Sequence, residues 1–155
     1  MVTELKQQRR GRKIAMSDAE RDEFLRASRV CRVATVGPSG PHATPLWYVW
    51  DGAALWLYSL TRSQRWADLM NDPRIGVVVD GGEQYLELHG VELTGTVTPV
   101  GEQPRAGEQN AELTEPERLF SSKYGDGQMH YDGAHAWLKV TPAKIVSWDF
   151  RKLAP

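Results

Sequence analysis

Candidate chemistry concentrates in residues 57–65, LYSLTRSQR, where an apolar run gives way to hydroxyl and basic side chains. The apolar run predicts a buried strand, and serine is a residue type that caps helix N-termini. Free amides at such a terminus, hydroxyls and a guanidinium would together bind an anion such as a phosphate. The residues that supply these side chains are Ser59, Thr61, Ser63 and Arg65. The same pattern is also typical of a capped surface helix with a solvated arginine.

The other titratable and nucleophilic side chains form weaker patterns. His130 and His135 flank an aspartate, but their spacing matches no standard zinc motif and the glycine between them predicts a loop, so we expect no metal site. His42 and His89 fall on predicted strands and are expected to face solvent or a hydrogen-bond partner. No Gly-x-Ser-x-Gly, Walker or Rossmann motif occurs, and the sequence therefore gives no support to a nucleophilic hydrolase.

The elements that must position the 57–65 corner are predicted to be mostly extended. The segment 84–100 alternates in polarity and predicts a long strand that bends at Gly90 and Gly95, as a closed six-stranded barrel requires. Turn signals separate successive strands by gaps too short for crossover helices, which favours antiparallel hairpins. These turn signals lie at 37–40, 51–52 and 81–82.

Two helices are predicted from capping boxes, in which a hydroxyl residue precedes a glutamate by three positions. One begins at Ser17 and the other at Thr114, and the second is expected to continue through Tyr124. A last pair of strands is expected at 136–140 and 145–150, interrupted by the proline-containing sequence between them.

Composition is typical of one globular domain. The chain has 155 residues, of which 41% are hydrophobic and 25% charged. A formal net charge of −1 argues against nucleic-acid binding through bulk charge. The one cysteine, Cys31, cannot form an internal disulfide. No signal peptide or apolar run near 18 residues occurs, so we expect a cytoplasmic protein without membrane association.

Residues 1–15 are the compositional exception, because basic side chains dominate them. They predict a disordered basic arm that precedes a single domain at 16–155. A solvated tail is the favoured interpretation. The alternatives are a tether for nucleic acid or anionic lipid, or a strap over a bound polyanion.

Four segments, taken in order, resemble the pyridoxamine-phosphate-oxidase-like split β-barrels, and in particular their flavin and deazaflavin oxidoreductase branch. The resemblance covers about residues 14–152. It implies a mainly β fold, a six-stranded antiparallel split barrel of the FMN-binding type with short flanking helices. The segments are VCRVATV at 30–36, GPHATPLWYVW at 40–50, the 57–65 corner, and NDPRIGVVVD at 71–80.

The resemblance also implies a set of cofactor-binding positions. The cofactor phosphate would lie against Tyr58, Ser59, Ser63, Gln64 and Arg65, where Gln64 replaces a basic residue and Arg65 replaces a lysine. The ring would lie beside the strand of Thr44, Pro45, Leu46, Trp47 and Tyr48. In this family the cofactor sits at a homodimer interface, and the second subunit would add side chains from its last strand: Trp148, Arg151 and Lys152.

Two departures argue against pyridoxamine phosphate as the substrate. Tyr48 stands where the true oxidases keep a lysine near the ring, and their C-terminal Arg-x-His is absent. The resemblance therefore implies hydride transfer between coenzyme F420, or FMN, and a small unsaturated or quinone-like molecule. No side chain is identified as the catalytic acid or base. A non-catalytic carrier of flavin, F420 or haem is the alternative, with His130 or His135 as a haem ligand.

Overall fold

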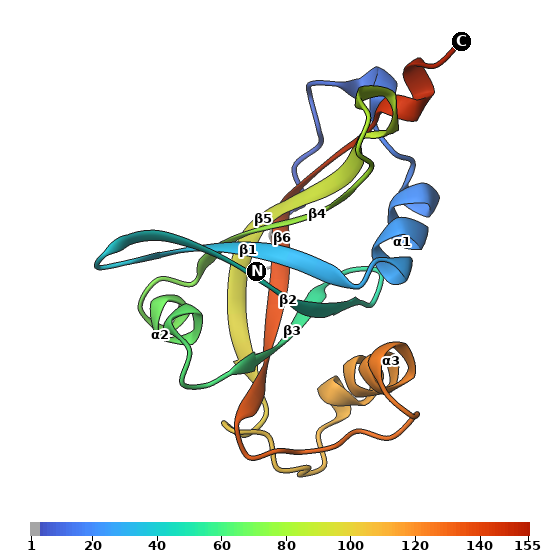
Figure 1. The fold of residues 1–155 in the computed structure, drawn as a ribbon. Helices are drawn as coiled ribbons and strands as arrows, with labels where there is room; N and C mark the ends of the chain where they lie inside the picture. The colour runs from blue at the N-terminus through green and yellow to red at the C-terminus, as the bar shows by residue number, and fades with distance from the viewer. Residues whose placement is uncertain (1–3) are drawn as a thin grey trace.

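Residues 4–155, which the computed structural model describes, contain six antiparallel strands that close into a barrel (Figure 1). The order around the barrel is β1-β2-β3-β6-β5-β4. This arrangement confirms the predicted mainly β, six-stranded antiparallel barrel. Over the same range, no helix combines the length and the apolar character needed to cross a lipid bilayer. The strands are β1 Val30–Gly37, β2 Gly40–Trp50, β3 Leu55–Leu60, β4 Arg74–Gly81, β5 His89–Val100 and β6 His135–Asp149.

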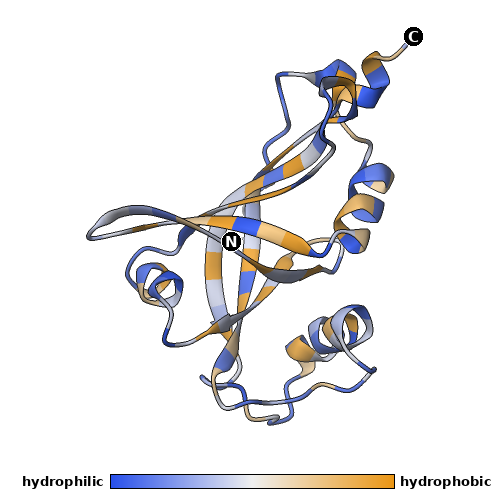
Figure 2. Ribbon diagram, viewed as in Figure 1, coloured by the Kyte–Doolittle hydropathy of each residue, from blue (hydrophilic) through white to orange (hydrophobic). Residues whose placement is uncertain are grey.

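The strands are amphipathic, so the barrel has a packed interior. In β1 the side chains of Cys31, Val33 and Thr35 are buried, and those between them are exposed. Figure 2 shows hydrophobic residues alternating with hydrophilic ones along the strands. A second, smaller core lies outside the barrel wall and includes Trp56 and Trp137 from β3 and β6.

Three α-helices flank the barrel in the described part of the chain. They are α1 Asp18–Ala27, α2 Gln64–Asn71 and α3 Thr114–Tyr124. The Ser17 hydroxyl accepts the Glu20 amide at 3.1 Å, and the Glu20 carboxylate accepts the Ser17 amide at 3.0 Å, which confirms the first capping box. In Figure 1, α2 lies beside the projecting β1–β2 hairpin, whereas α3 packs on the outer side of β2 and β3.

The predicted hairpin turns are confirmed. Gly37 pairs with Gly40 across the β1–β2 turn, and the Asp51 carboxylate accepts amides in the β2–β3 turn. Gly82 follows β4 with φ +90°, and a Cβ there would lie 2.3 Å from the Glu87 carbonyl oxygen. The turn therefore requires glycine at position 82.

Two extended segments differ from the prediction. The strand expected from residue 84 begins at His89, because Tyr85–Glu87 form a short 3-10 helix, η2, whose Glu87 carboxylate accepts the Gln84 amide. The last two predicted strands are one continuous strand, β6. Pro142 is accommodated because the β5–β6 pairing shifts register at Thr94/Gly95 opposite it, and a Cβ at Gly95 would lie 2.1 Å from the Thr141 carbonyl oxygen.

Part of the basic N-terminal segment, which the sequence predicts as a disordered arm, contacts the barrel in the structure. Residues 1–3 lie outside the described residues, but from Glu4 onward the chain runs along β6 and forms a short 3-10 helix, η1, at Arg12–Ile14. The Lys6 amide donates to the Ala143 carbonyl at 2.9 Å. The Gln8 side chain exchanges two hydrogen bonds with the Ser147 backbone, at 2.9 and 3.0 Å. In this part of β6 only β5 lies alongside as a paired strand, and the N-terminal segment bonds to backbone groups on the other side of β6.

Candidate functional site

The corner between β3 and α2 forms as predicted. Ser63 caps α2: its hydroxyl accepts the Trp66 amide at 3.1 Å and donates to the Leu60 carbonyl at 2.8 Å. The backbone amides of Gln64 and Arg65 lie in the first turn of α2, so neither has a hydrogen-bond acceptor within the helix. A cleft of about 370 Å³ adjoins this turn, between α2 and the segment before β6. Its lining residues are Leu60, Thr61, Arg62, Ser63, Gly133 and Ala134.

Arg65 brings three elements together. Its guanidinium donates to the Ser59 hydroxyl of β3 at 3.2 Å and to the Thr44 hydroxyl of β2 at 2.8 Å. Both acceptors are neutral, and within residues 4–155 no carboxylate forms an ion pair with Arg65. Burial lowers the pKa of Arg65 below its ordinary value, since the charged guanidinium has lost water. A half-buried cation with only neutral partners favours the arrival of an anion.

Two of the predicted phosphate-binding side chains have other partners. The Gln64 amide donates to the Asp68 carboxylate at 2.8 Å, and the Thr61 hydroxyl donates to the Ala134 carbonyl at 3.2 Å. Tyr58 points to the outer face of the barrel, where its ring stacks on His135 and lies tilted against Trp137. The corner therefore presents Arg65 with the hydroxyls and amides around it, and Arg62 lines the adjoining cleft.

The strand of Thr44 to Tyr48 divides its side chains between two faces. Tyr48 is fully buried, and its hydroxyl donates to the Leu25 carbonyl at 2.6 Å. The Tyr48 amide and carbonyl both contact the Tyr124 hydroxyl, at 3.2 and 2.7 Å. Leu46 packs against the barrel core, whereas Pro45 is exposed. Tyr48 is therefore not available to a ligand through its side chain or its backbone.

An aromatic shelf of Trp47, Tyr58, Tyr124 and His135 lies on the outer face of β2, β3 and β6. Trp47 is 46% exposed and stacks on Tyr124, with ring centroids 4.3 Å apart and an interplanar angle of 9°. The Tyr58 and His135 rings stack at 5.0 Å, and Asp132 holds the His135 ring through Nδ1. The Tyr58 hydroxyl is buried without a hydrogen-bond partner among the described residues, and burial raises its pKa.

Lys123 of α3 was not singled out in the sequence. Its ammonium group lies 4.1 Å from the centroid of the Tyr48 ring and donates to the Tyr48 carbonyl at 3.3 Å. Burial, and secondarily the charge of Arg29, lower the pKa of Lys123 to about 8. A lysine in the last turn of a helix is ordinarily explained by the helix dipole, so the sequence carried no signal of this inward orientation.

The predicted contributors from the last strand do not join the corner within one chain. Lys152 donates to the Glu20 carboxylate at 2.8 Å and to the Ala15 carbonyl at 3.0 Å, and Arg151 pairs with Asp149. Trp148 pairs with Gly90, where a Cβ would lie 2.5 Å from the indole. Figure 1 shows this C-terminal end, η4 Phe150–Leu153, at the opposite end of the barrel from α3.

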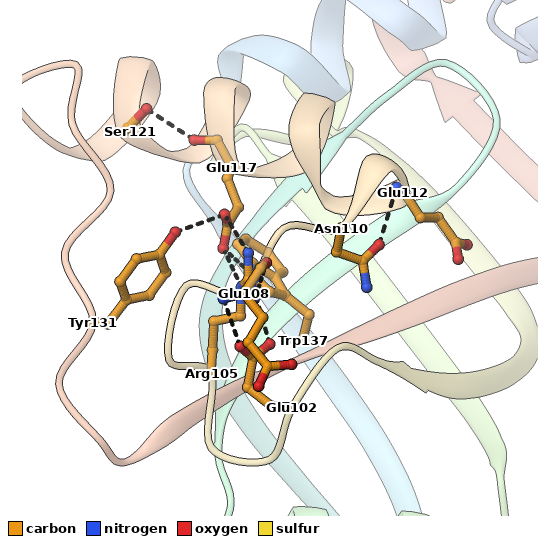
Figure 3. Close-up of polar contacts among 9 residues, drawn as sticks. All are labelled: Glu102, Arg105, Glu108, Asn110, Glu112, Glu117, Ser121, Tyr131 and Trp137. Atoms are coloured by element: carbon orange, nitrogen blue, oxygen red, sulfur yellow. Dashed lines mark hydrogen bonds and ion pairs between the residues drawn. The ribbon is translucent and has the colours of Figure 1, made fainter.

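The loop that borders the shelf is fixed by a buried arginine. Arg105, 4% exposed, donates to the carboxylates of Glu102 and Glu117, and Glu117 also accepts Trp137 Nε1 and the Tyr131 hydroxyl, both at 2.9 Å (Figure 3). Burial alone would raise the pKa of Glu102, but the Glu108 amide and Arg105 outweigh it and hold that pKa at about 2. The short 3-10 helix η3, Ala111–Leu113, follows this loop.

The second predicted capping box is wrong, because Glu117 belongs to this cluster. The helix α3 exists and ends at Tyr124 with Gly125 beyond it, as expected, but Thr114 does not cap it. Glu117 points to Arg105 and Trp137 instead of returning to the Thr114 amide. Within residues 4–155, no group of three His, Cys, Asp or Glu side chains is arranged to bind a metal ion.

Comparisons with known proteins identify the family and the fold. The family model described as pyridoxamine 5'-phosphate oxidase matches residues 17–149. A conserved hypothetical protein from Mycobacterium tuberculosis is 30% identical, with 97% of this chain and 94% of that chain covered and a TM-score of 0.77. No curated protein matches the chain.

Two more distant structures share the fold. A FAD-binding protein from Mesorhizobium loti is 17% identical, with a TM-score of 0.63, and 86% of this chain and 93% of that chain are covered. An F420 reductase is 20% identical, with a TM-score of 0.60, and 80% of this chain and 94% of that chain are covered.

Proposed function

The chain belongs to the pyridoxamine 5'-phosphate oxidase family, and on that premise we propose that it is an oxidoreductase that binds F420 or FMN. Its substrate would be a small unsaturated or quinone-like molecule. The cofactor ring, when bound, supplies the hydride-transfer chemistry. The protein supplies position, electrostatics and exclusion of water.

The observation that carries this proposal is the environment of Arg65. A half-buried guanidinium, oriented by two hydroxyls and free of carboxylates among residues 4–155, is the donor set that a phosphate or phosphodiester requires. The opening amides of α2 and the adjoining cleft extend the same site. Thr44 and Arg65 thus fit a cofactor phosphate, whereas Ser59 is fully buried and orients the guanidinium, and Ser63 caps α2. The side chains of Gln64 and Thr61 stabilise the corner through hydrogen bonds to Asp68 and to the Ala134 carbonyl.

The aromatic shelf fits the planar part of such a cofactor. Trp47 offers an exposed indole face, and Pro45 and Leu60 beside it are also exposed. Tyr48, which replaces the oxidase lysine, is buried and engaged, so it cannot act near the ring. This difference favours F420 over FMN and argues against pyridoxamine phosphate.

The proposed assembly is a homodimer. Val30 and Val36 of β1 are 42% and 50% exposed, and both point away from the barrel interior. An apolar groove of about 530 Å³ continues this surface across β4 and β5. A second copy on this face would bury apolar area, and its Trp148 and Lys152 would complete the cofactor site.

The test is a matched titration of the protein with F420, FMN and haem, followed by tryptophan fluorescence and absorbance. Arg65→Ala should weaken binding of the preferred cofactor by about 1.5–3 kcal/mol, or roughly 10- to 150-fold, if the guanidinium contacts phosphate. Arg118→Ala is the control, because Arg118 is exposed on α3, pairs with Glu115 and lies outside both the corner and the apolar groove. Equal affinity in the Arg65 variant would refute the phosphate assignment.

A non-catalytic carrier is the second candidate, and the absence of an assigned catalytic acid or base favours it. Tight binding of F420 or FMN without turnover across several electron acceptors would support this alternative. A Soret band with haem, lost in a His130 or His135 variant, would identify a haem carrier.

A further inference from the structure

Three side chains from two elements form a hydrogen-bonded chain at the tip of the β1–β2 hairpin. The Ser39 hydroxyl lies 3.2 Å from His42 Nε2, and His42 Nδ1 lies 2.8 Å from the Asp68 carboxylate. Ser39 is in the turn and His42 in β2, whereas Asp68 comes from α2. With the proton of the imidazole on Nδ1, Asp68 accepts it and Nε2 is left to accept the Ser39 hydroxyl.

The carboxylate at the end of this chain is held in place from several sides. Asp68 is fully buried, and it also accepts the Thr35 hydroxyl at 3.0 Å and the Gln64 amide at 2.8 Å. The hydrogen bonds from Gln64 and His42 lower its pKa, so it remains ionised. A Cβ at Gly37 would lie 2.1 Å from the Asp68 carboxylate, and glycine is therefore required there for Asp68 to reach the hairpin.

Solvent exposure increases along this hydrogen-bonded series, from the Asp68 carboxylate to the Ser39 hydroxyl. Asp68 is buried, the His42 side chain is 33% exposed, and Ser39 is exposed in the turn. No described atom lies within 4 Å of a Cβ built on the neighbouring Gly40, so the turn is open to an incoming molecule. A buried acid, an oriented base and an accessible hydroxyl are the parts of an activated serine nucleophile.

We propose that Ser39, activated by His42 and Asp68, is a nucleophile toward activated acyl compounds such as aryl esters. The Ser39 oxygen bonds to the acyl carbon, the ester C–O bond breaks, and the hydroxyl proton passes to His42 Nε2 and from there to the departing aryl oxygen. In the second half of the cycle, water donates a proton to His42 and adds to the acyl carbon. Ser39 then leaves as the alcohol by regaining that proton. This site is separate from Arg65 and stands independently of the proposed cofactor chemistry.

The first experiment combines p-nitrophenyl acetate with a fluorophosphonate probe on the full-length protein. The expected results are a burst of one p-nitrophenol per chain and modification mapped to the peptide that contains Ser39. Ser39→Ala should abolish both, and His42→Gln should slow acylation by about 100-fold or more. Modification of Ser39→Ala at the wild-type rate, or of a different residue in the wild type, would overturn the proposal.

A second measurement does not depend on turnover or on substitution of the buried Asp68. In Ser39→Cys, alkylation of the introduced thiol by iodoacetamide is followed against pH, and Cys31 contributes no background because it is fully buried. Pairing with His42 should shift the reaction midpoint below that of the double variant Ser39→Cys, His42→Gln. Identical midpoints in the two proteins would show that His42 does not activate position 39.

Discussion

At the scale of single residues, α2 carries two opposite charges three positions apart, Arg65 and Asp68, and each has its own hydrogen-bond partners. Arg65 extends toward the hydroxyls of β2 and β3, whereas Asp68 extends toward the hairpin tip and is hydrogen-bonded to His42 there. Gln64 donates to Asp68 and so belongs to the second group. Because the acid has its own donors, it does not neutralise the guanidinium, and Arg65 retains its capacity to bind an external anion.

Tyr58 offers a direct test of the shelf. Its hydroxyl is buried without a partner among the described residues, so Tyr58→Phe should leave the free energy of unfolding unchanged or raise it by up to about 1 kcal/mol. Chemical denaturation of the ligand-free protein measures this change. If the hydroxyl contacts the cofactor, the same variant should bind it more weakly. A loss of more than about 1 kcal/mol in the ligand-free protein would show that the hydroxyl has a partner there.

At the scale of elements, Arg105 connects pieces that local sequence does not relate. It joins the loop after β5 to α3, and through Glu117 it reaches the Trp137 indole of β6. The cluster holds two carboxylates on one guanidinium (Figure 3). Removal of that guanidinium would leave the carboxylates partly buried and uncompensated.

This arrangement predicts a pH dependence of stability. The ordinary pKa of a glutamate is 4.5, and that of Glu102 is about 2 in the folded protein. A lowered folded-state pKa stabilises the protein above pH 4.5, and this contribution is lost as the pH falls toward 2. Arg105→Gln should lower the free energy of unfolding at pH 7 and should have progressively less effect toward pH 2. Urea unfolding at several pH values measures the difference, and a penalty independent of pH would contradict this account.

The N-terminal segment gives a second prediction at this scale. Gln8→Ala removes two hydrogen bonds to the Ser147 backbone of β6 and should lower the free energy of unfolding by about 1–2 kcal/mol. Gln7 is its matched control, since it is exposed, and Gln7→Ala should stay within about 0.5 kcal/mol of the wild type. Thermal and urea unfolding would compare them. Equal effects of the two substitutions would show that the segment does not stabilise β6.

Local patterns predicted those features that local residues determine. The Ser63 cap, the hairpin turns and the proximity of Ser59 to Arg65 follow from short motifs and from the family resemblance. Thr44, which the resemblance assigns to the ring, contacts Arg65 instead. Long-range pairing decided the rest. Pro142 stays within one strand because the register shifts opposite it, and His42 meets Asp68 because α2 packs on β1. A docked N-terminal segment cannot be inferred from its basic composition, because backbone hydrogen bonds to β6 hold it.

At the scale of the whole molecule, the two outer faces of the barrel differ. The face beneath α3 is covered by the aromatic shelf and the Arg105 cluster, whereas the outward face of β1 and β4 carries exposed apolar side chains and a groove. Such a surface is larger than scattered single hydrophobic residues would give. The proposed homodimer buries it and brings the C-terminal end of one copy to the corner of the other.

Val36→Glu tests that assembly without disturbing the barrel core. Val36 is 50% exposed and points outward, so a glutamate is tolerated in the monomer but would be buried unpaired in the dimer. A cost of about 2 kcal/mol or more would raise the dimer dissociation constant at least about 30-fold. Ala53→Glu is the control, since Ala53 is exposed in the β2–β3 turn, outside the proposed interface. Light scattering coupled to size-exclusion chromatography measures both variants.

Because the second copy would supply Trp148 and Lys152, cofactor affinity should fall together with dimerisation. A monomeric variant with full affinity would confine the cofactor site to a single chain.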